Sequence, residues 1–333
     1  MLRRRINEKG AVMPLRQRVL GKTNISVAEV GLGLWAVEGS DWGRADDKES
    51  LEAVEKALES GVNFFDTSDV YGNGHSEELL GRAMKGRREK FVVSTKIGWR
   101  GFTDGHSAYT TVDKLIAGVE SNLKRLQTDY LDIIFDHINF QESTMPVFVE
   151  GFAKLQKQGK LKGWGLSTSD FEYLKKFNAG GGCSVVQIDY SLLNRTSEAD
   201  ILPYCVKENI GLVIRGPLAM GLLAGKFTKD SHFEKTDFRH NWTEDPAQNK
   251  TYLEDLAKVE KLKPLAQGRT LAQLALQFTL AYPAGLVVIP GAKNPEQVEA
   301  NVAAGLLPPL TPEEMKKLDA VTPPRGGRKI WPA

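Results

Sequence analysis

The sequence predicts an α/β protein that folds as one (β/α)8 barrel with an N-terminal β-hairpin. The main observation is that short apolar runs alternate with amphipathic stretches, which is typical of parallel strands joined by helices. Eight such runs occur, and eight parallel strands are the number that closes into a barrel. An open, doubly wound sheet is the alternative architecture. The expected strands span residues 30–33, 63–66, 91–96, 131–135, 162–167, 185–188, 211–214 and 286–289.

The segments around these strands fit the same architecture. Residues 16–30 are typical of a hairpin, because two short β-prone stretches flank the turn Gly21-Lys-Thr-Asn24. Thr311-Pro-Glu-Glu314 combines a capping residue, a proline at the first helical position and a glutamate three residues beyond the cap, which predicts a helix start. Further helices are expected over residues 49–60, 112–127, 147–157 and 295–304.

One connection, the polar stretch from Phe227 to Lys250, is expected to be a long loop that lies over a site. No linker divides the chain. We therefore expect a leader over residues 1–15, a single barrel domain over residues 16–322 and a C-terminal tail over residues 323–333. Arg3 to Arg5 also allow a targeting or basic contact segment, although no apolar stretch follows them.

Composition excludes several classes of function. The chain has 44 Lys and Arg against 42 Asp and Glu, so there is no electrostatic case for binding nucleic acid or an anionic membrane. It has no apolar run of about 18 residues, which argues against a membrane span. Its two cysteines, Cys183 and Cys205, are too few for a disulfide framework and lack metal-ligand spacing. We expect a cytoplasmic protein without a metal, whose cysteines are core residues.

Ionisable residues end three successive predicted strands. Asp66, Lys96 and His137 follow the second, third and fourth strands, and Tyr71 lies in the loop just beyond Asp66. In a barrel these positions share one mouth. A tyrosine hydroxyl has a pKa near 10, and a neighbouring ammonium group favours the phenolate and lowers that pKa. A carboxylate would hold the lysine, and a neutral imidazole could orient a carbonyl oxygen.

Each of these residues also has a structural interpretation. Asp66 is followed by Thr67 and Ser68, so it could be a turn or cap residue. Lys96 could be a solvated strand end, Tyr71 a turn residue and His137 a hydrogen-bonded residue of the barrel rim. Their order on successive units favours one catalytic site over four coincidences.

Three segments resemble those of the aldo-keto reductase family. They are Asn63-Phe-Phe-Asp-Thr-Ser-Asp-Val-Tyr-Gly72 with His75-Ser-Glu-Glu-Leu-Leu-Gly81, then Ser94-Thr-Lys96, and Tyr130-Leu-Asp-Ile-Ile-Phe-Asp-His137. The similarity runs from about residue 16 to residue 318 and points to the branch with channel beta subunits and sugar- or inositol-related oxidoreductases. It implies a TIM barrel that reduces carbonyls with a nicotinamide cofactor. Tyr71 would be the general acid, Lys96 its pKa-lowering partner, Asp66 the counter-charge and His137 the carbonyl-orienting group.

The resemblance extends to the nicotinamide end of a cofactor site. Ser167 and Thr168 match a Ser-Asn pair that holds the carboxamide, with threonine in place of the usual asparagine, and Gln187 matches the third carboxamide ligand. A glutamine in a buried strand needs a hydrogen-bonding partner in any case. Four residues of the loop Pro217-Leu-Ala-Met-Gly-Leu-Leu-Ala-Gly225 and its entry are implied to cover the pyrophosphate: Gly216, Pro217, Leu218 and Gly225.

The adenosine end is implied by Ile289-Pro-Gly-Ala-Lys-Asn-Pro-Glu-Gln297 followed by Asn301. Gly291 would form the turn before a helix N-terminus, which is a general anion site. Lys293 would meet the 2′-phosphate, with Gln297 and Asn301 at the adenosine. The cofactor is therefore expected to be NADP(H), with NAD(H) as the alternative.

Other positions depart from the family pattern or suggest a different motif. Arg215 stands where many relatives place an aromatic residue against the nicotinamide, and a guanidinium can stack too. Asp136 precedes His137 where an apolar residue is usual. Adjacent strand residues point to opposite faces, so it is expected to face away; if it approached His137 instead, it would raise the pKa of the histidine. Gly31-Leu-Gly-Leu-Trp-Ala36 fits a dinucleotide fingerprint, but no helix signal follows it. We interpret it as the first barrel strand, with Trp35 at the cofactor and the floor of the substrate pocket.

Three hypotheses about function follow. The first is NADPH-dependent reduction of an aldehyde or ketone, or the reverse on a sugar or alcohol, with a substrate pocket that includes Trp35, Trp99 and the Phe227 to Lys250 loop. The second is a cofactor-binding regulatory module with little turnover. The third is an unrelated barrel enzyme, which would require paired carboxylates or metal ligands at the strand ends.

Overall fold

The computed structural model describes residues 14–37, 42, 45–99, 102–103, 106–107, 109–137 and 142–330. Its strands are β1 (Gln17–Val19), β2 (Ser26–Ala28), β3 (Leu32–Gly33), β4 (Phe64–Asp66), β5 (Val92–Ile97), β6 (Phe102–Thr103), β7 (His106–Ser107), β8 (Leu131–His137), β9 (Leu161–Ser167), β10 (Val185–Asp189), β11 (Gly211–Arg215) and β12 (Leu286–Val288). Its α-helices are α1 (Asp47–Glu59), α2 (His75–Met84), α3 (Val112–Leu126), α4 (Met145–Lys157), α5 (Phe171–Phe177), α6 (Ile201–Lys207), α7 (His240–Glu244), α8 (Pro246–Leu262), α9 (Leu271–Leu280), α10 (Pro295–Leu306) and α11 (Pro312–Val321).

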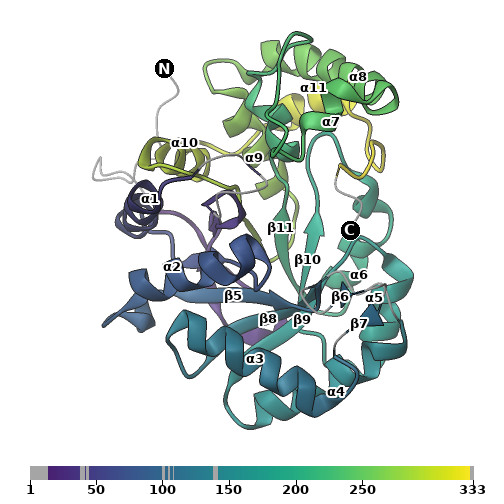
Figure 1. The fold of residues 1–333 in the computed structure, drawn as a ribbon. Helices are drawn as coiled ribbons and strands as arrows, with labels where there is room; N and C mark the ends of the chain where they lie inside the picture. The colour runs from purple at the N-terminus through teal and green to yellow at the C-terminus, as the bar shows by residue number, and fades with distance from the viewer. Residues whose placement is uncertain are drawn as a thin grey trace.

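Eight parallel strands form the barrel, in the order β12-β11-β10-β9-β8-β5-β4-β3. Parallel bridges from Val30 to Val288 and from Gly33 to Gly291 join the first strand to the last. Each of the eight predicted apolar runs contributes one strand, and helices surround them (Figure 1). The (β/α)8 barrel is confirmed, and the open sheet is excluded.

The glycines of Gly31-Leu-Gly-Leu-Trp-Ala36, which resemble a dinucleotide-binding fingerprint, are explained by packing. A Cβ atom on Gly31 would lie 2.9 Å from the carbonyl oxygen of Phe64, and one on Gly33 would lie 2.7 Å from that of Ile289. These glycines therefore allow neighbouring backbones to approach where the barrel closes. The residues that follow, Trp35–Val37, form a single 3-10 turn.

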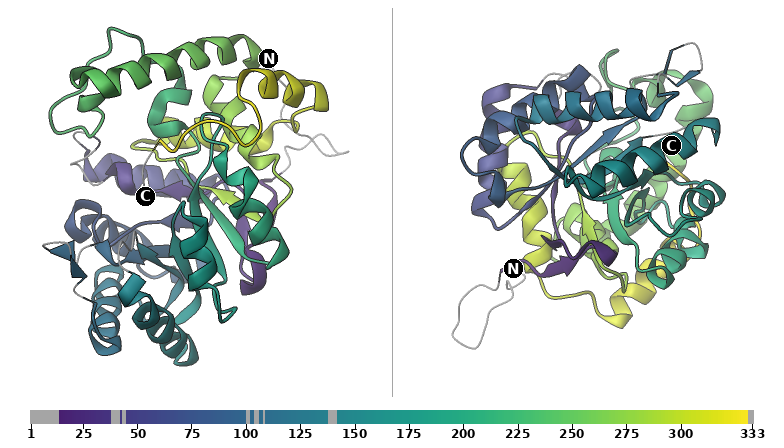
Figure 2. Two further views of the ribbon diagram at one scale, coloured as in Figure 1. Left: turned by 90° about the vertical axis from the view of Figure 1, so that its right-hand side faces the viewer. Right: turned by 90° about the horizontal axis from the view of Figure 1, so that it is seen from below.

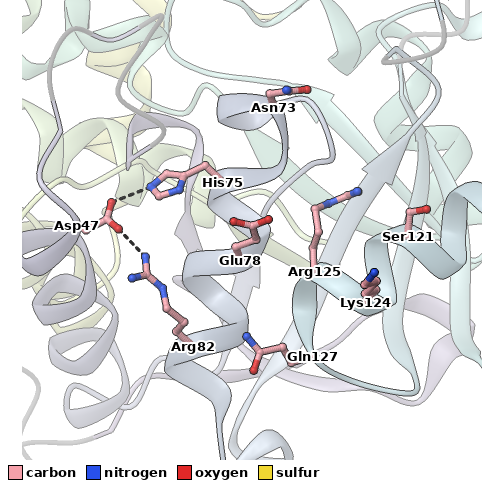
Figure 3. A pocket seen from close by; sticks show the side chains of 9 residues that line it. All are labelled: Asp47, Asn73, His75, Glu78, Arg82, Ser121, Lys124, Arg125 and Gln127. Atoms are coloured by element: carbon pink, nitrogen blue, oxygen red, sulfur yellow. Dashed lines mark hydrogen bonds and ion pairs between the residues drawn. The ribbon is translucent and has the colours of Figure 1, made fainter.

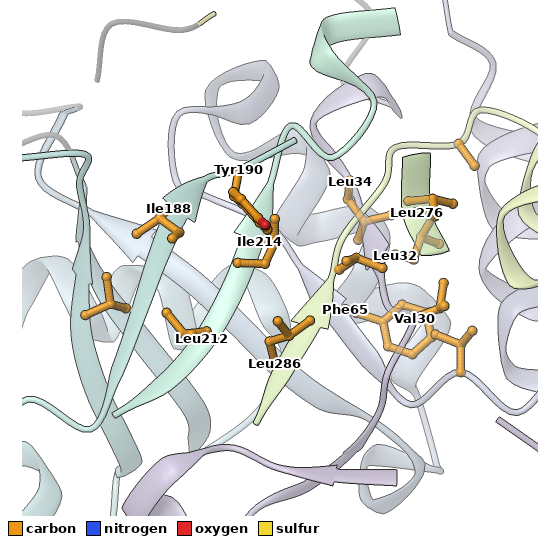
Figure 4. Packing of buried hydrophobic residues seen from close by; sticks show 14 of the residues in the cluster. Val30, Leu32, Leu34, Phe65, Ile188, Tyr190, Leu212, Ile214, Leu276 and Leu286 are labelled. Atoms are coloured by element: carbon orange, nitrogen blue, oxygen red, sulfur yellow. The ribbon is translucent and has the colours of Figure 1, made fainter. Parts of the chain in front are cut away.

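Two apolar layers hold the fold together. Inside the barrel, side chains such as Phe64, Phe135 and Val185 pack against Leu20 and Val27 of the hairpin. A larger outer layer lies between strands and helices, and Figure 4 shows part of it. The hairpin itself is antiparallel, as predicted, and is the dark purple segment in Figure 2. Its contacts with the inner layer fill the end of the barrel away from the strands' carboxyl ends.

The predicted helices are present and begin within two residues of the predicted starts, but the predicted loop over residues 227–250 needs a correction. Thr311 forms a capping box with Glu314 at the start of α11. The segment from Phe227 to Lys250, however, is not a loop throughout, because α7 and the first residues of α8 lie within it. The missed signal is Asp245-Pro246: the Asp245 side chain accepts a hydrogen bond from the Gln248 N–H and Pro246 occupies the first turn. Figures 1 and 2 show α7, α8 and α11 gathered on one side of the molecule.

The structure describes more of the predicted C-terminal tail than of the predicted N-terminal leader. Residues 1–13, most of the predicted leader, lie outside the described residues, whereas Leu15 is already part of the outer core. At the other end, the segment predicted as a tail packs on the barrel as far as Ile330. Arg328 forms an ion pair with Asp255 of α8, and the Ile330 N–H donates to the Asp189 carboxylate.

Candidate active site

The four residues predicted to be catalytic meet at the carboxyl ends of β4, β5 and β8. Asp66 ends β4, Lys96 is the penultimate residue of β5, His137 ends β8, and Tyr71 begins the turn before α2. The Lys96 Nζ atom lies 2.6 Å from Oδ2 of Asp66 and 3.0 Å from the hydroxyl oxygen of Tyr71. The Tyr71 and His137 rings meet edge to face with centroids 6.2 Å apart. One buried ammonium group thus contacts both the carboxylate and the phenol.

Asp66 is held by three donors on two strands, β5 and β10. Besides Lys96, its Oδ1 atom accepts hydrogen bonds from Oγ of Ser94 at 2.7 Å and from Nε2 of Gln187 at 2.9 Å. Lys96 also donates to the carbonyl oxygen of Thr67 at 2.9 Å. A buried ion pair is stable only when its remaining hydrogen-bonding capacity is met, and these contacts meet it.

The protonation states suit an acid rather than a phenolate. Burial raises the pKa of Tyr71, and the opposing influence of the Lys96 charge is smaller, so the phenol keeps its proton at neutral pH. Burial also disfavours the Lys96 ammonium, but Asp66 and Tyr71 outweigh it and raise the pKa of Lys96. Lys96 does lower the pKa of Tyr71, as expected. The predicted net lowering is nevertheless wrong, because desolvation raises the Tyr71 pKa by more than Lys96 lowers it.

His137 is a buried neutral imidazole. Burial lowers its pKa well below the ordinary value, and the charges of Lys96 and Arg215 lower the pKa further. Its Nδ1 atom lies 3.1 Å from Oγ of Ser68, and the Trp99 ring packs edge to face against it at 5.4 Å. Asp136 belongs to the opposite face of β8, because Ile133 and Phe135 share the inner face with His137 and Ile134 packs in the outer layer.

Aromatic side chains form a wall next to Tyr71. Trp35 stacks on the Tyr71 ring at 5.7 Å and on the Phe238 ring at 5.7 Å, with nearly parallel planes. Trp42 meets both Trp35 and Phe238 edge to face. The segment after β11, which supplies Phe238, therefore lies beside the mouth, as the sequence predicts for this connection.

The residues expected at the nicotinamide lie on neighbouring strand ends. Ser167 ends β9, and Gln187, in β10, donates its Nε2 hydrogen to Asp66. Thr168 follows Ser167, and its hydroxyl accepts a hydrogen bond from the Asp170 N–H at 3.0 Å. Gln187 thus joins the expected carboxamide site directly to the carboxylate of Asp66.

Arg215 and the residues after it enter the same mouth. Arg215 ends β11, its Nη2 atom donates to Oγ of Ser169 at 3.3 Å, and burial lowers its pKa. Gly216 has a positive φ of 61°, and a Cβ atom there would lie 2.8 Å from the Asp189 carboxylate. The chain then continues through Pro217 and Leu218 into the turn Ala219–Ala224, which ends at Gly225 with φ of 72°.

The residues expected at the adenosine form a second group around the start of α10. Lys293 donates its backbone N–H to the side-chain oxygen of Gln297 and its Nζ hydrogen to the carbonyl oxygen of Trp42, at 2.9 and 2.6 Å. Asn301 donates to the carbonyl oxygen of Gly291 at 3.3 Å. Burial and the nearby Arg239 charge lower the pKa of Lys293.

Sequence reasoning missed several residues of the site. Ser94 and Ser68 contact Asp66 and His137, and Trp42 and Phe238 complete the aromatic wall. The two serines carried a usable signal, since Ser94 has the inward parity of Lys96 and Ser68 follows a catalytic strand end. Trp42 carried none, because its position depends on the path of a long connection, and Phe238 was predicted only as part of the Phe227 to Lys250 segment.

A large surface groove of about 800 Å³ lies elsewhere, along α1, α2 and α3 (Figure 3). Its charges are mixed: Asp47 pairs with both His75 and Arg82, and none of the four predicted catalytic residues lines it. Behind it, fully buried Glu77 accepts hydrogen bonds from Nε of Arg125 and from Oγ1 of Thr95. Burial raises the pKa of Glu77 to about 7 despite Arg125.

The described residues contain neither a metal-binding cluster nor a membrane-spanning helix. No group of three or more His, Cys, Asp or Glu side chains there is arranged to hold a metal ion. Within the same part of the chain, every helix is too short or too polar to cross a bilayer.

Comparison with known proteins gives the family. The model of the aldo/keto reductase family matches residues 29–323, and the chain belongs to that family. It is 32% identical over 286 residues to the aldo-keto reductase YhdN of Bacillus subtilis, covering 84% of this chain and 86% of the relative. It is also 32% identical over 329 residues to a probable voltage-gated potassium channel subunit beta of Oryza sativa subsp. japonica, covering 92% and 96%.

Solved structures agree. An aldo/keto reductase from Klebsiella pneumoniae, in complex with NADP and acetate, superposes with a TM-score of 0.70 and 26% identity over 93% of this chain and 96% of that one. The family membership and these similarities support oxidoreductase chemistry and confirm the resemblance predicted from the sequence, including its branch.

Proposed function

We propose that this chain is an NADP(H)-dependent oxidoreductase that reduces aldehydes or ketones to alcohols, or runs the reverse reaction on a sugar or alcohol. The observation that carries the proposal is the contact of one buried ammonium group, Lys96 Nζ, with both Asp66 and the Tyr71 hydroxyl. A phenol that keeps its proton beside a fixed cation is suited to donate that proton to an oxygen on which negative charge develops.

The residues present fit NADP(H). Gln187 donates to Asp66 through Nε2, which turns its carbonyl oxygen toward other partners, and Ser167 lies on the adjacent strand. At the other end, Lys293 lies near Arg239, whose guanidinium pairs with Asp237, and cations of this kind bind phosphate groups. We assign Trp35, Ser167, Thr168, Gln187, Arg215, the Gly216 to Gly225 loop, Gly291, Lys293, Gln297 and Asn301 to this site. The bound cofactor would supply or accept the hydride.

The catalytic residues then have distinct tasks. Tyr71 donates its hydroxyl proton to the carbonyl oxygen during reduction and recovers one in the reverse direction. Lys96 stabilises the phenolate that remains, because the ammonium lies 3.0 Å from the hydroxyl oxygen. Asp66 holds that ammonium charged and in place, while His137 lines the carbonyl subsite as a neutral ring.

The substrate would lie against the aromatic wall. Trp35 and Phe238 present stacked rings beside Tyr71, and Trp99 packs edge to face on His137. Apolar walls around a few fixed polar groups are typical of small-molecule sites. A carbonyl compound with an apolar or partly apolar body fits this lining.

The test is a Tyr71→Phe substitution combined with a screen of NADPH and NADH oxidation against aldehydes, ketones and sugars. Loss of the general acid lowers turnover by about 100- to 10,000-fold while the fold is retained. Tyr130→Phe is the matched control, because Tyr130 directly precedes β8, at the strand end opposite His137. Turnover of Tyr71→Phe equal to that of the unmodified protein would overturn the mechanism.

The second candidate is a cofactor-binding regulatory module, which the similarity to a probable channel subunit beta favours. The contacts of Lys96 with Asp66 and Tyr71 favour an enzyme that turns over its substrate over a module that only binds the cofactor. Tight NADPH binding, measured by fluorescence, with negligible turnover of every carbonyl tested and a stable partner in pull-downs would establish the module.

The cysteines are consistent with a cytoplasmic location, which we also propose. Cys183 and Cys205 are both free and buried. Burial raises the pKa of Cys183 to about 12 and raises that of Cys205 as well, so neither thiol is reactive at neutral pH.

A further inference from the structure

Two residues of opposite charge lie side by side at the mouth of the barrel. Asp189 ends β10 and Arg215 ends β11, and the two residues are register partners on these neighbouring parallel strands. Both point inward, because Val185 and Val213 of the inner layer precede them by an even number of residues on the same strands. In the strand order, β10 and β11 stand opposite β4 and β5.

The Asp189 carboxylate is fixed by its surroundings. It is 2% exposed, and its Oδ2 atom accepts hydrogen bonds from Nδ2 of Asn194 at 2.8 Å and from the Ile330 N–H at 3.2 Å. Its other oxygen, Oδ1, faces the strand of Arg215, because a Cβ atom on Gly216 would lie 2.8 Å from it. The glycine therefore leaves room for the carboxylate directly after Arg215.

Arg215 has two supports. Its Nη2 atom donates to Oγ of Ser169, whose backbone carbonyl oxygen accepts a hydrogen bond from Nζ of Lys329 at 2.7 Å. Asp189 acts on it through charge: burial lowers the pKa of Arg215, and the negative charge of Asp189 opposes that shift. The C-terminal residues Lys329 and Ile330 thus contact both supports, Ser169 and Asp189.

The Arg215 charge also reaches the residues on the other side of the mouth. Burial raises the pKa of Tyr71, whereas Lys96 and Arg215 both lower it. Burial and Lys96 lower the pKa of His137, and Arg215 lowers it further. The nicotinamide ring must lie next to the carbonyl that Tyr71 protonates, because reacting atoms meet at about 3–3.5 Å. The ring is therefore within the field of Arg215 as well.

The two redox forms of the cofactor differ in charge at this ring. The oxidised nicotinamide carries a positive charge, and the reduced ring is neutral. Because arginine stays protonated in proteins, a guanidinium without a counter-charge would repel the oxidised form and have little effect on the reduced form. A carboxylate next to the guanidinium cancels most of this repulsion.

We propose that the Arg215–Asp189 pair sets the relative affinity of the site for oxidised and reduced cofactor, with Asp189 cancelling the repulsion that Arg215 alone would exert on the oxidised ring. Asp189 is a positioning residue in this role, because it acts through Arg215. The proposal rests on the proposed function, which assigns Arg215 to the cofactor site.

The test is the ratio of the dissociation constant of NADP⁺ to that of NADPH, measured by titration calorimetry without substrate. Asp189→Asn leaves the guanidinium without its counter-charge, so we expect this ratio to rise about tenfold. Arg215→Met leaves the carboxylate alone, so the ratio should fall about tenfold. The double variant should return to within about threefold of the unmodified protein. Shifts of opposite sign identify the charges, because structural damage weakens the binding of both forms.

Two further variants serve as controls. Arg215→Lys keeps the positive charge and should leave the ratio near that of the unmodified protein. Asp129→Asn removes an exposed carboxylate two residues before β8 and should not change the ratio. A constant ratio in Arg215→Met, or shifts of the same sign in both single variants, would overturn the proposal. If Asp189→Asn does not fold, the fall in Arg215→Met and its reversal in the double variant decide.

Unfolding by denaturant tests the pairing without cofactor. Asp189→Asn should lower the unfolding midpoint more in the unmodified protein than in Arg215→Met, because only the former keeps the guanidinium. An equal loss in both backgrounds would show that Asp189 acts only through Asn194 and Ile330, and would overturn the pairing. A protein that binds neither NADPH nor NADP⁺ would refute the proposed function, whereas binding of both with an unmoved ratio would refute only the role of the pair.

Discussion

The two ends of the barrel are built from the same strands but have opposite chemistry. On β4 the inward residues are Phe64 and then Asp66, and on β8 they are Phe135 and then His137. On β10 Val185 is followed by the inward Gln187. In each case two residues, about 7 Å of strand, separate the apolar interior from the polar mouth.

This difference shows how the protein keeps a buried ion pair. The apolar interior, closed below by Leu20 and Val27, keeps water away from one side of the Lys96–Asp66 pair. Hydrogen bonds from Ser94 and Gln187 supply the solvation that water would have given. The end closed by Leu20 and Val27 is stabilised by apolar packing, whereas the mouth is stabilised by a network of hydrogen bonds and one ion pair. Substitutions at the two ends should therefore change stability and turnover differently.

The largest effect is expected at the mouth. Asp66→Asn leaves the buried Lys96 ammonium without its counter-charge, and we expect a loss of about 3–5 kcal/mol of unfolding free energy together with loss of turnover. Denaturant unfolding measures the first and the NADPH assay the second. The double variant Asp66→Asn with Lys96→Met, which removes both charges, regains stability but no turnover. Failure of the double variant to regain stability would show that the charge itself is not the cause.

Leu20→Ala probes the sealed end. The Leu20 side chain is fully buried against the inner layer, so we expect a loss of about 2–5 kcal/mol of stability, with turnover per folded molecule unchanged. The neighbouring Val19 is 52% exposed, and Val19→Ala should change stability by about 0.5 kcal/mol or less. A loss of turnover that exceeds the loss of folded protein would mean that the two ends are coupled.

A third prediction concerns Glu77, a buried residue of α2 that contacts Thr95 of β5 and Arg125 of α3. Its pKa is about 7 in the folded protein against 4.5 in the unfolded chain, so the folded state binds the proton more tightly. Stability therefore falls as pH rises from about 4.5 to about 7, by up to about 3 kcal/mol, because ionisation places an incompletely solvated charge there. Glu77→Gln should abolish this part of the pH dependence in unfolding experiments. An unchanged slope would exclude Glu77 as its origin.

The smallest effect is expected at Arg215. Its charge is one of three causes that lower the pKa of His137, after burial and Lys96. Arg215→Met should raise the pKa of His137 by about one unit or less, as followed by NMR titration, and Arg215→Lys should preserve the lowered pKa. If both variants raise the pKa equally, packing rather than charge is the cause.

The contrast between the apolar interior and the polar mouth also explains which features could be predicted from the sequence. The eight strands were predictable because each is an apolar run with clear boundaries, and Asp66, Lys96 and His137 because each follows or ends such a run. The net pKa of Tyr71 was not predictable, since it depends on how far burial exceeds the influence of Lys96. The helices inside the segment 227–250 were missed although Asp245-Pro246 marks one start, because a polar composition outweighed a local cap.

Barrel closure also has a consequence for synthesis on the ribosome. Val30 pairs with Val288, so the first strand gains its second neighbour only after the last strand has been translated. At roughly 5–20 residues per second, that strand waits on the order of tens of seconds with one edge unpaired. The hairpin waits as well, because Leu20 belongs to the same inner layer as Val213 and Val287. The hairpin and the first strand are therefore among the last parts of the barrel to be fixed, although they are translated before the other strands.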